Sequence, residues 1–290
     1  MTHQPHHGPA VASDGGSVRL RLDLAYDGAG FRGWAVQPGQ RTVAGLLEES
    51  LATVLRTDVP RIRSGLVVAG RTDAGVHATA QCVHVDVDQE SLARAGGTVG
   101  ATRRLRSLLA PEVRLTAMAP APPGFDARFS ALRRHYRYRV CDDPAGPDPL
   151  RRHDTLAHPR PLDTGLLTAA SRQLLGLQDF AAFCRRREGA TTVRTLLSYV
   201  WSREPDGTVV AQVTADAFCH SMVRALVGAV LPVGDGRAVM GFPLEVLLAR
   251  RRDPRVTVAA AHGLTLVAVD YPDDAGLAAR AVESRARRDD

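Results

Sequence analysis

The stretch LVVAGRTDAGVHATAQCVHVDV occupies residues 66–87 and predicts two strands with a loop between them. Its apolar start, residues 66–69, favours a short buried strand. At its end, valine occupies every second position, which is typical of a strand with two unlike faces. Between the strands, Gly70 and Gly75 flank Asp73. Glycine on both sides lets the backbone of this loop approach a ligand closely.

The same periodicities continue on both sides of this stretch. Alternation of apolar and polar residues predicts strands over residues 18–26, 136–140, 197–201, 209–213 and 264–269. Helical spacing predicts helices over residues 43–55 (with Thr42 as cap), 163–175, 218–230 and 244–251. The order strand, helix, strand, strand occurs twice. We therefore expect an α+β fold of two similar α/β halves with mostly antiparallel mixed sheets, and a cleft between the halves as the place of a binding site.

Composition along the chain suggests where these halves begin and end. The start is rich in His, Gly and Pro, and a proline-rich segment lies near the middle, where it could serve as a linker. The predicted order is a disordered tail (1–17), an N-terminal half with the Asp73 loop (18–119), a linker (120–127), a C-terminal half (128–272) and a flexible C-terminal tail (273–290).

The charge of the chain favours a nucleic-acid partner. Its 290 residues include 37 basic side chains, all of them arginine, and the formal net charge is +6. Arginine binds phosphate in a bidentate manner and stacks on bases. A genomic composition bias that replaces lysine by arginine throughout would also explain the missing lysine. Such a bias does not remove the net positive charge. No apolar run reaches membrane-spanning length and no signal sequence is visible, so we expect a cytoplasmic protein without a membrane partner.

Asp73 is the strongest candidate for chemistry in the loop. Arg71 lies two residues before it and could keep the carboxylate ionised and oriented. Such a carboxylate can act as a nucleophile or base. A salt-bridged surface turn has the same spacing and stays open as an interpretation. A metal-dependent hydrolase using Asp73 and His77 is a further hypothesis, but no second cluster of acids and histidines lies nearby, so no metal is expected.

Six blocks in order resemble the TruA family of tRNA pseudouridine synthases. They are YDGAGFRGW (26–34), GRTDAGVHA (70–78), FDARFSA (125–131), RHYRY (134–138), DFAAF (179–183) and ADAFCHSMVR (215–224). The resemblance covers residues 18–271. It implies an isomerase without a cofactor that converts uridine to pseudouridine in the anticodon stem-loop of tRNA, at positions 38–40. It also implies that the cleft between the halves is the active site. It also implies a homodimer that acts on tRNA and not on DNA.

The resemblance also implies roles for individual residues. Asp73 would be the nucleophile, Arg71 would hold it and face the phosphates, and Tyr136 would pack on the target base and could take the C5 proton. A core tyrosine on a strand stays open as an interpretation of Tyr136. Substrate contacts are implied for Arg128, Phe129, His220 and Arg224. For the two arginines of that set, a salt bridge and a phosphate contact both stay open.

Five positions depart from the family pattern. Ala35 and Ala44 replace glutamines, Asp126 replaces a histidine, Asp216 an asparagine, and Ser221 the second of two histidines. An added acid at position 216 would weaken a phosphate contact made there. These departures keep open a catalytically silent tRNA-binding protein on the same fold. It would bind tRNA with a steep salt dependence but form no pseudouridine.

Overall fold

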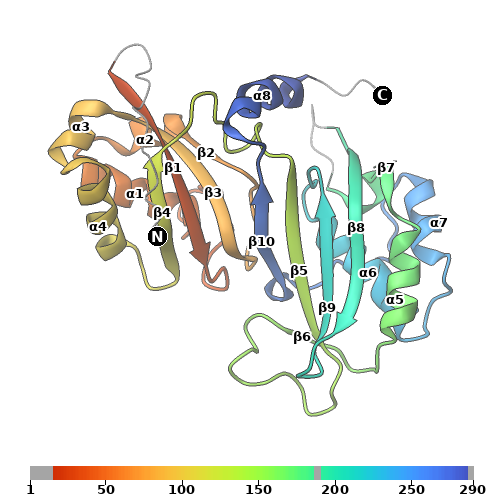
Figure 1. The fold of residues 1–290 in the computed structure, drawn as a ribbon. Coiled ribbons are helices and arrows are strands. Elements are labelled where there is room, and N and C mark those ends of the chain that lie inside the picture. Colours follow the sequence, from red (N-terminus) through yellow and green to blue (C-terminus); the bar gives the residue numbers. More distant parts are fainter. Residues whose placement is uncertain (1–15, 186–190, 287–290) are drawn as a thin grey trace, which may run out of the picture.

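Within residues 16–185 and 191–286, which the computed structural model describes, one ten-stranded sheet runs through the molecule (Figure 1). The strands are β1 (Ser17–Tyr26), β2 (Leu66–Val68), β3 (His77–Asp88), β4 (Val113–Pro120), β5 (Arg133–Cys141), β6 (Leu156–Ala157), β7 (Gly176–Asp179), β8 (Val193–Arg203), β9 (Val209–Ala215) and β10 (Leu264–Asp270). Their order is β4-β1-β3-β10-β5-β9-β8-β7, with β2 beside β3 and β6 beside β5. The predicted α+β class with mostly antiparallel pairing is confirmed.

Helices gather at both ends of the sheet (Figure 1). The first group is α1 (Val43–Leu55), α2 (Val59–Gly65), α3 (Gln89–Arg94) and α4 (Gly97–Leu108), and the second is α5 (Thr164–Arg172), α6 (Met222–Gly234) and α7 (Phe242–Ala249). Helix α8 (Leu277–Arg285) lies between these groups, above the middle of the sheet in the view of Figure 1. Three short 3₁₀ turns are η1 (Ala181–Phe183), η2 (Ala261–Gly263) and η3 (Asp274–Gly276). In the described part of the chain, no helix is long and apolar enough to cross a membrane.

Helix α1 and strand β1 show how the sequence pattern builds the core. The leucines of β1 at positions 20, 22 and 24 are fully buried, as alternation predicts. In α1, Leu47 and Leu51 lie on one face and join the same core cluster. The Thr42 hydroxyl accepts a hydrogen bond from the Gly45 amide and so begins the helix. Both elements have the bounds that the pattern predicts to within one residue.

Strand β10 joins the two predicted halves. It pairs in parallel with β3, where Leu266 lies opposite Ala78, and antiparallel with β5, where Leu266 lies opposite Tyr136. The two predicted sheets are therefore one continuous sheet. Because neighbouring strands are about 4.8 Å apart, Tyr136 lies about 10 Å from Ala78. The loop that precedes β3 and carries Asp73 is thus brought close to Tyr136.

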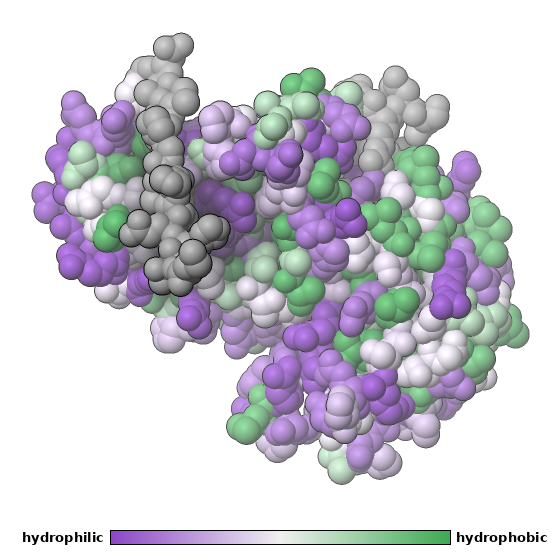
Figure 2. All heavy atoms as spheres, viewed as in Figure 1, coloured by the Kyte–Doolittle hydropathy of each residue, from purple (hydrophilic) through white to green (hydrophobic). Residues whose placement is uncertain are grey.

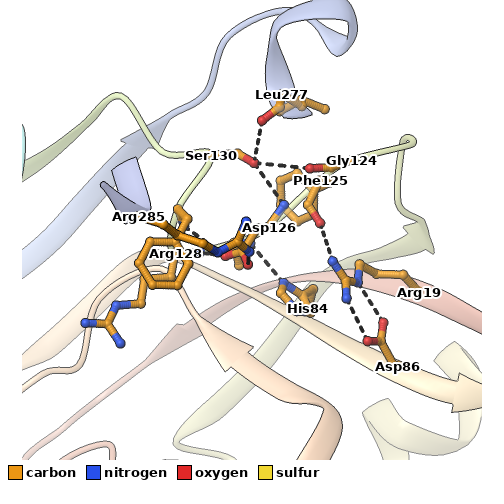
Figure 3. A network of polar contacts seen from close by, with 12 residues as sticks. Arg19, His84, Asp86, Gly124, Phe125, Asp126, Arg128, Ser130, Leu277 and Arg285 are labelled. Carbon is orange, nitrogen blue, oxygen red and sulfur yellow. Dashed lines mark hydrogen bonds and ion pairs between the residues drawn. The ribbon is translucent and has the colours of Figure 1, made fainter. Parts of the chain in front are cut away.

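The segment predicted as a linker is packed into the molecule. Phe125 and Ala127 are fully buried. As Figure 3 shows, Arg19 reaches up from β1 and donates to the Phe125 carbonyl at 2.8 Å. The Ala127 amide donates to Nδ1 of His84 at 2.9 Å, and burial lowers the pKa of His84 to about 4. This segment therefore has fixed contacts with β1 and β3. The domain boundaries themselves stay a prediction.

The expectation of a flexible tail over residues 273–290 is wrong for the helical part. Leu277 and Ala281 of α8 are buried, and the Ser130 hydroxyl donates to the Leu277 carbonyl at 3.0 Å (Figure 3). Arg285 donates to a carboxylate oxygen of Asp126 at 2.7 Å. The helix presents few apolar residues, so its periodic signal is weak. Of the predicted tails, residues 1–15 and 287–290 lie outside the described residues, and Ser17 already belongs to β1.

The surface in the view of Figure 2 mixes hydrophilic and hydrophobic residues, with several hydrophobic patches toward the end of the molecule that carries α5 and α7. Exposed hydrophobic side chains on elements of that end include Leu166, Leu177 and Leu248. Scattered exposed apolar residues are normal for soluble domains and do not by themselves indicate a site.

Candidate active site

A cavity of about 730 Å³ lies between the Asp73 loop and the segments that surround it. Residues 66–73, which follow α2 and include β2, form one wall. Tyr136 of β5 and residues 217–224, which lead from β9 into α6, form another. The cavity therefore takes its lining from both predicted halves. Ala35 and Ala44, where the family has glutamine, also line it and leave small side chains there.

The Asp73 loop is supported by close backbone packing. A Cβ at Gly28 would lie 2.0 Å from the Val76 carbonyl oxygen, so only glycine fits there. Below the loop, the Tyr26 hydroxyl forms a hydrogen bond with the Thr72 hydroxyl at 2.8 Å. Burial raises the pKa of Tyr26 to about 12, so this phenol is neutral at ordinary pH. The loop is thus held from two sides.

The Asp73 carboxylate is held by residues from the segment that begins α6. The Ser221 hydroxyl donates to Asp73 Oδ2 at 2.8 Å, and Nη1 of Arg224 donates to the same oxygen at 3.2 Å. Nε2 of His220 lies 3.5 Å from Oδ1. The Asp73 side chain is 19% exposed, which leaves it accessible from the cavity. A paired and partly exposed carboxylate has the features of an oriented nucleophile.

Arg224 makes the contact that the spacing predicted for Arg71. Its Nε donates to the Ala259 carbonyl at 2.7 Å while Nη1 reaches Asp73. Of the two interpretations of Arg224, the structure has the salt bridge. Arg71 is exposed on the cavity wall and has no ion-pair partner in residues 16–185 and 191–286. The expected pairing of Arg71 with Asp73 does not occur there.

Tyr136 lies on the cavity wall with its ring nearly perpendicular to that of Phe218. The ring centroids are 5.1 Å apart and the planes cross at 88°. Burial raises the pKa of Tyr136, and the negative charge of Asp73 acts in the same direction. Asp73 and Tyr136 both line this cavity. The Tyr136 hydroxyl has no hydrogen-bond partner in the described part of the chain.

Comparison with known proteins shows the family. A family model described as tRNA pseudouridine synthase matches residues 170–272. The tRNA pseudouridine synthase A of Frankia casuarinae is 61% identical over 273 residues, 94% of this chain and 96% of the relative. Those of Streptomyces griseus (54% identical; 93% of this chain, 94% of the relative) and Mycobacterium leprae (53%; 96% of each) are also similar. This chain belongs to the tRNA pseudouridine synthase A family.

The predicted resemblance and the prediction of an isomerase are thereby confirmed. A chain in a solved Cbf5-Nop10-Gar1 complex aligns with 73% of this chain and 54% of its own length, at 11% identity and a TM-score of 0.30. That similarity is too low to support the family assignment further.

The other predicted site residues of this family member lie at different distances from the cavity. Arg128 and His220 line it. Phe129 does not belong to the lining. The guanidinium groups of Arg128 and Arg285 lie 5.0 and 4.8 Å from the centroid of its ring. Asp126, which stands where the family has histidine, accepts hydrogen bonds from the amides of Arg128 and Phe129. The structure therefore gives this departure a role in the local turn.

Arg134 is a residue of the site that the sequence did not single out. It is buried, and its guanidinium donates to the carbonyls of Asp216, Ala69 and Arg128 at 2.7 to 2.8 Å. These acceptors lie on three segments around the cavity, so Arg134 connects its walls. The Asp216 carboxylate accepts from the amides of Thr195 and Ala217. The only sequence signal for Arg134 was its place in the RHYRY block.

The hypothesis of a metal site shared by Asp73 and His77 does not fit the geometry. Nδ1 of His77 lies 3.1 Å from the Gly28 amide and Nε2 lies 2.9 Å from the His153 carbonyl. Asp73 instead faces Ser221 and Arg224. In residues 16–185 and 191–286, no group of three or more His, Cys, Asp or Glu side chains is arranged to hold a metal ion.

Proposed function

We propose that this chain isomerises uridine to pseudouridine in tRNA, at positions 38–40 of the anticodon stem-loop, with Asp73 as the nucleophile. The observation that carries the proposal is the Asp73 carboxylate, fixed by Ser221 and Arg224 on the wall of a cavity of about 730 Å³. Small-ligand sites span about 300–1,000 Å³, so the cavity has room for a nucleotide that has left its stack.

The net reaction changes only bonds within the substrate, although Asp73 bonds to it transiently. Asp73 attacks the target nucleoside, and the bond between uracil N1 and C1′ of the ribose breaks. The detached uracil turns in the cavity, and its C5 forms the new bond to C1′. The bond between Asp73 and the nucleoside then breaks, which restores the free carboxylate. Loss of the C5 proton to a base and protonation of N1 complete an isomerisation with no net change in composition. No cofactor is needed for these steps.

Tyr136 suits a packing role on the target base. Its pKa is raised by burial, so the phenol is protonated at neutral pH and is poorly suited to accept the C5 proton. Its ring lies on the cavity wall beside Phe218. Stacking of an aromatic ring on a base contributes about 1–3 kcal/mol. This contribution offsets the cost of unstacking the target nucleotide, which is a few kcal/mol.

Arginines around the cavity would bind the phosphates of the RNA. Arg71 and Arg128 line the cavity, and neither has an ion-pair partner in the described ranges. An arginine with a free fork can bind one phosphate through two hydrogen bonds. Such contacts supply affinity that falls as salt rises and read the RNA backbone more than its sequence.

We also propose that the protein is a cytoplasmic homodimer in which one tRNA touches both subunits, as the family resemblance implies. Sedimentation with and without tRNA measures the stoichiometry directly. A chain that sediments as a monomer in both conditions would contradict the dimer.

The experiment for the proposed function is incubation of the purified protein with an unmodified tRNA transcript. Pseudouridines are then mapped by carbodiimide labelling and primer extension. We expect new pseudouridine at one or more of positions 38–40 and nowhere else in the transcript. Salt-dependent binding without any pseudouridine would instead support the catalytically silent tRNA-binding protein.

A further inference from the structure

Ser221 has a backbone conformation that serine rarely adopts. Its φ of 61° and ψ of 9° lie in the left-handed region. Among the described residues, the other non-glycine residues with positive φ are Arg56 and Arg250. Those two end α1 and α7, where a left-handed residue is ordinary. Ser221 instead precedes the first turn of α6, where extended backbone is usual. Helix geometry therefore does not explain its conformation.

The Ser221 hydroxyl also gives up the hydrogen bond that serine normally makes at this position. A serine before the first turn usually accepts a bond from an amide of that turn. In α6 no such side-chain cap is formed. The hydroxyl donates to Asp73 Oδ2 at 2.8 Å instead. Two local preferences are thus given up for one contact with the candidate nucleophile, as is typical of strain kept at a functional site.

We propose that Ser221 is a positioning residue that fixes which oxygen of Asp73 meets the substrate. This inference rests on the proposed role of Asp73 as the nucleophile. Ser221 and Arg224 both donate to Oδ2. Oδ1 lies 3.5 Å from His220 Nε2, which is longer than a charge-assisted hydrogen bond of about 2.7–2.9 Å. Oδ1 therefore keeps its lone pairs for the attack.

His220 fixes the orientation of the Ser221 hydroxyl. A hydroxyl has one hydrogen, and Ser221 donates it to Asp73. At 3.1 Å from Nδ1 of His220, the hydroxyl oxygen therefore accepts a hydrogen bond from that nitrogen. The chain of contacts runs from His220 through Ser221 to Asp73. The departure from histidine at position 221 thus supplies a contact to Asp73 in this chain.

The test uses Ser221→Gly and Ser221→Ala. Glycine removes the hydroxyl and adopts positive φ without strain. The thermal stability of the Ser221→Gly variant should therefore equal or exceed that of the wild type. Alanine removes the hydroxyl and keeps the Cβ. In both variants we expect kcat to fall about 10- to 100-fold, the range for one hydrogen bond to a charged group, with an unchanged KM for tRNA.

Two further variants separate positioning from folding. Asparagine tolerates a left-handed backbone and carries an NH₂ donor, so Ser221→Asn should recover part of the kcat that Ser221→Ala loses. Arg56→Gly relieves a similar left-handed conformation at the end of α1, outside the cavity lining. It should leave kcat unchanged. A fall in kcat together with a rise in stability for Ser221→Gly is an effect that a purely structural serine would not give.

Equal kcat for the wild type, Ser221→Gly and Ser221→Ala would overturn the positioning role. Asp73→Ala in the same assay separates this result from a failure of the proposed function. If Asp73→Ala is inactive while the Ser221 variants are normal, only the positioning role falls. Turnover by Asp73→Ala would overturn the nucleophile and the positioning role together.

Discussion

Arg224 links the Asp73 carboxylate to a second part of the chain. Its Nη1 donates to Asp73 Oδ2, and its Nε donates to the Ala259 carbonyl. Two contacts on one planar group fix its orientation, which a flexible ammonium group could not do. The side chain is 20% exposed, so water screens this pair only in part. We therefore propose that Arg224 acts on Asp73, the proposed nucleophile, and not on the RNA backbone.

Replacing Arg224 by lysine tests this assignment. Lysine keeps the charge but cannot reproduce both contacts, so we expect kcat to fall about 10- to 100-fold while KM for tRNA stays unchanged. Steady-state kinetics on tRNA at several salt concentrations provide the measurement. A raised KM with a shallower salt dependence and a normal kcat would show a phosphate contact instead.

The local sequence singled out the Asp73 loop but did not predict the partners of Asp73. Ser221 and Arg224 lie 148 and 151 residues after Asp73, whereas the spacing pointed to Arg71, two residues before it. A pattern confined to one loop carries no information about which distant segment folds over it. The family resemblance named Arg224 and His220 but left the contact of Arg224 open and treated Ser221 only as a departure.

At the scale of elements, prediction succeeded where periodicity and capping agree. Helix α1 has a side-chain cap and a regular apolar stripe, and the hairpin of β8 and β9 has a turn with Gly207 at φ +82°. Helix α6 begins at residue 222, four residues after the predicted start, because residues 216–221 form the irregular segment that meets Asp73. Helix α4 was missed because it starts with glycine and has few buried residues.

The loop that carries Asp73 should be sensitive to Gly28. In Gly28→Ala the added methyl group would lie 2.0 Å from the Val76 carbonyl oxygen, so the loop must shift. Overpacking of this kind costs about 1–3 kcal/mol of stability, and we expect kcat to fall because Asp73 moves with the loop. Urea unfolding and kinetics measure both effects. The control is Gly241→Ala, where a Cβ has open space and φ is negative; a similar loss there would contradict the explanation.

His84 should make the contact between β3 and the 124–130 segment depend on pH. Its pKa in the folded protein is about 4, below the ordinary 6.5. The folded state disfavours the protonated ring. The contribution of neutral His84 to the free energy of unfolding is therefore complete above pH 6.5 and is lost as pH falls toward 4. The loss is about 3 kcal/mol at most. Urea midpoints measured at pH values between 4 and 6.5 give this loss of stability. In His84→Asn, which keeps an acceptor for the Ala127 amide, the dependence should become flatter; parallel curves would contradict this role.

At the scale of the molecule, β10 decides the geometry of the site. The repeated order of elements predicted two halves, and the pairing of β10 with both β3 and β5 makes them one sheet. Nothing in the alternation of β10 specifies its neighbours, because a strand buried on both faces fits beside many others. The sequence could therefore predict a site between the halves, but not the register that brings Asp73 and Tyr136 to one cavity.

The buried tyrosines should couple the fold to alkaline pH. Burial raises the pKa of all five above the ordinary 10.0, that of Tyr26 to about 12 and the others further. A raised folded-state pKa gives stability that is complete below the unfolded value of 10 and is lost as pH rises through the folded values. We expect tyrosinate absorbance near 295 nm to appear together with loss of circular dichroism. Ionisation near pH 10 in the folded protein would contradict this burial.

The most direct test of the central claim is tritium release from C5-labelled uridine in tRNA by the wild type and by Asp73→Ala. Both proteins should bind the tRNA, because the proposed phosphate contacts do not depend on Asp73. We predict that the wild type releases tritium and Asp73→Ala releases none at equal occupancy. Release by Asp73→Ala would show that another group starts the reaction and would contradict the account.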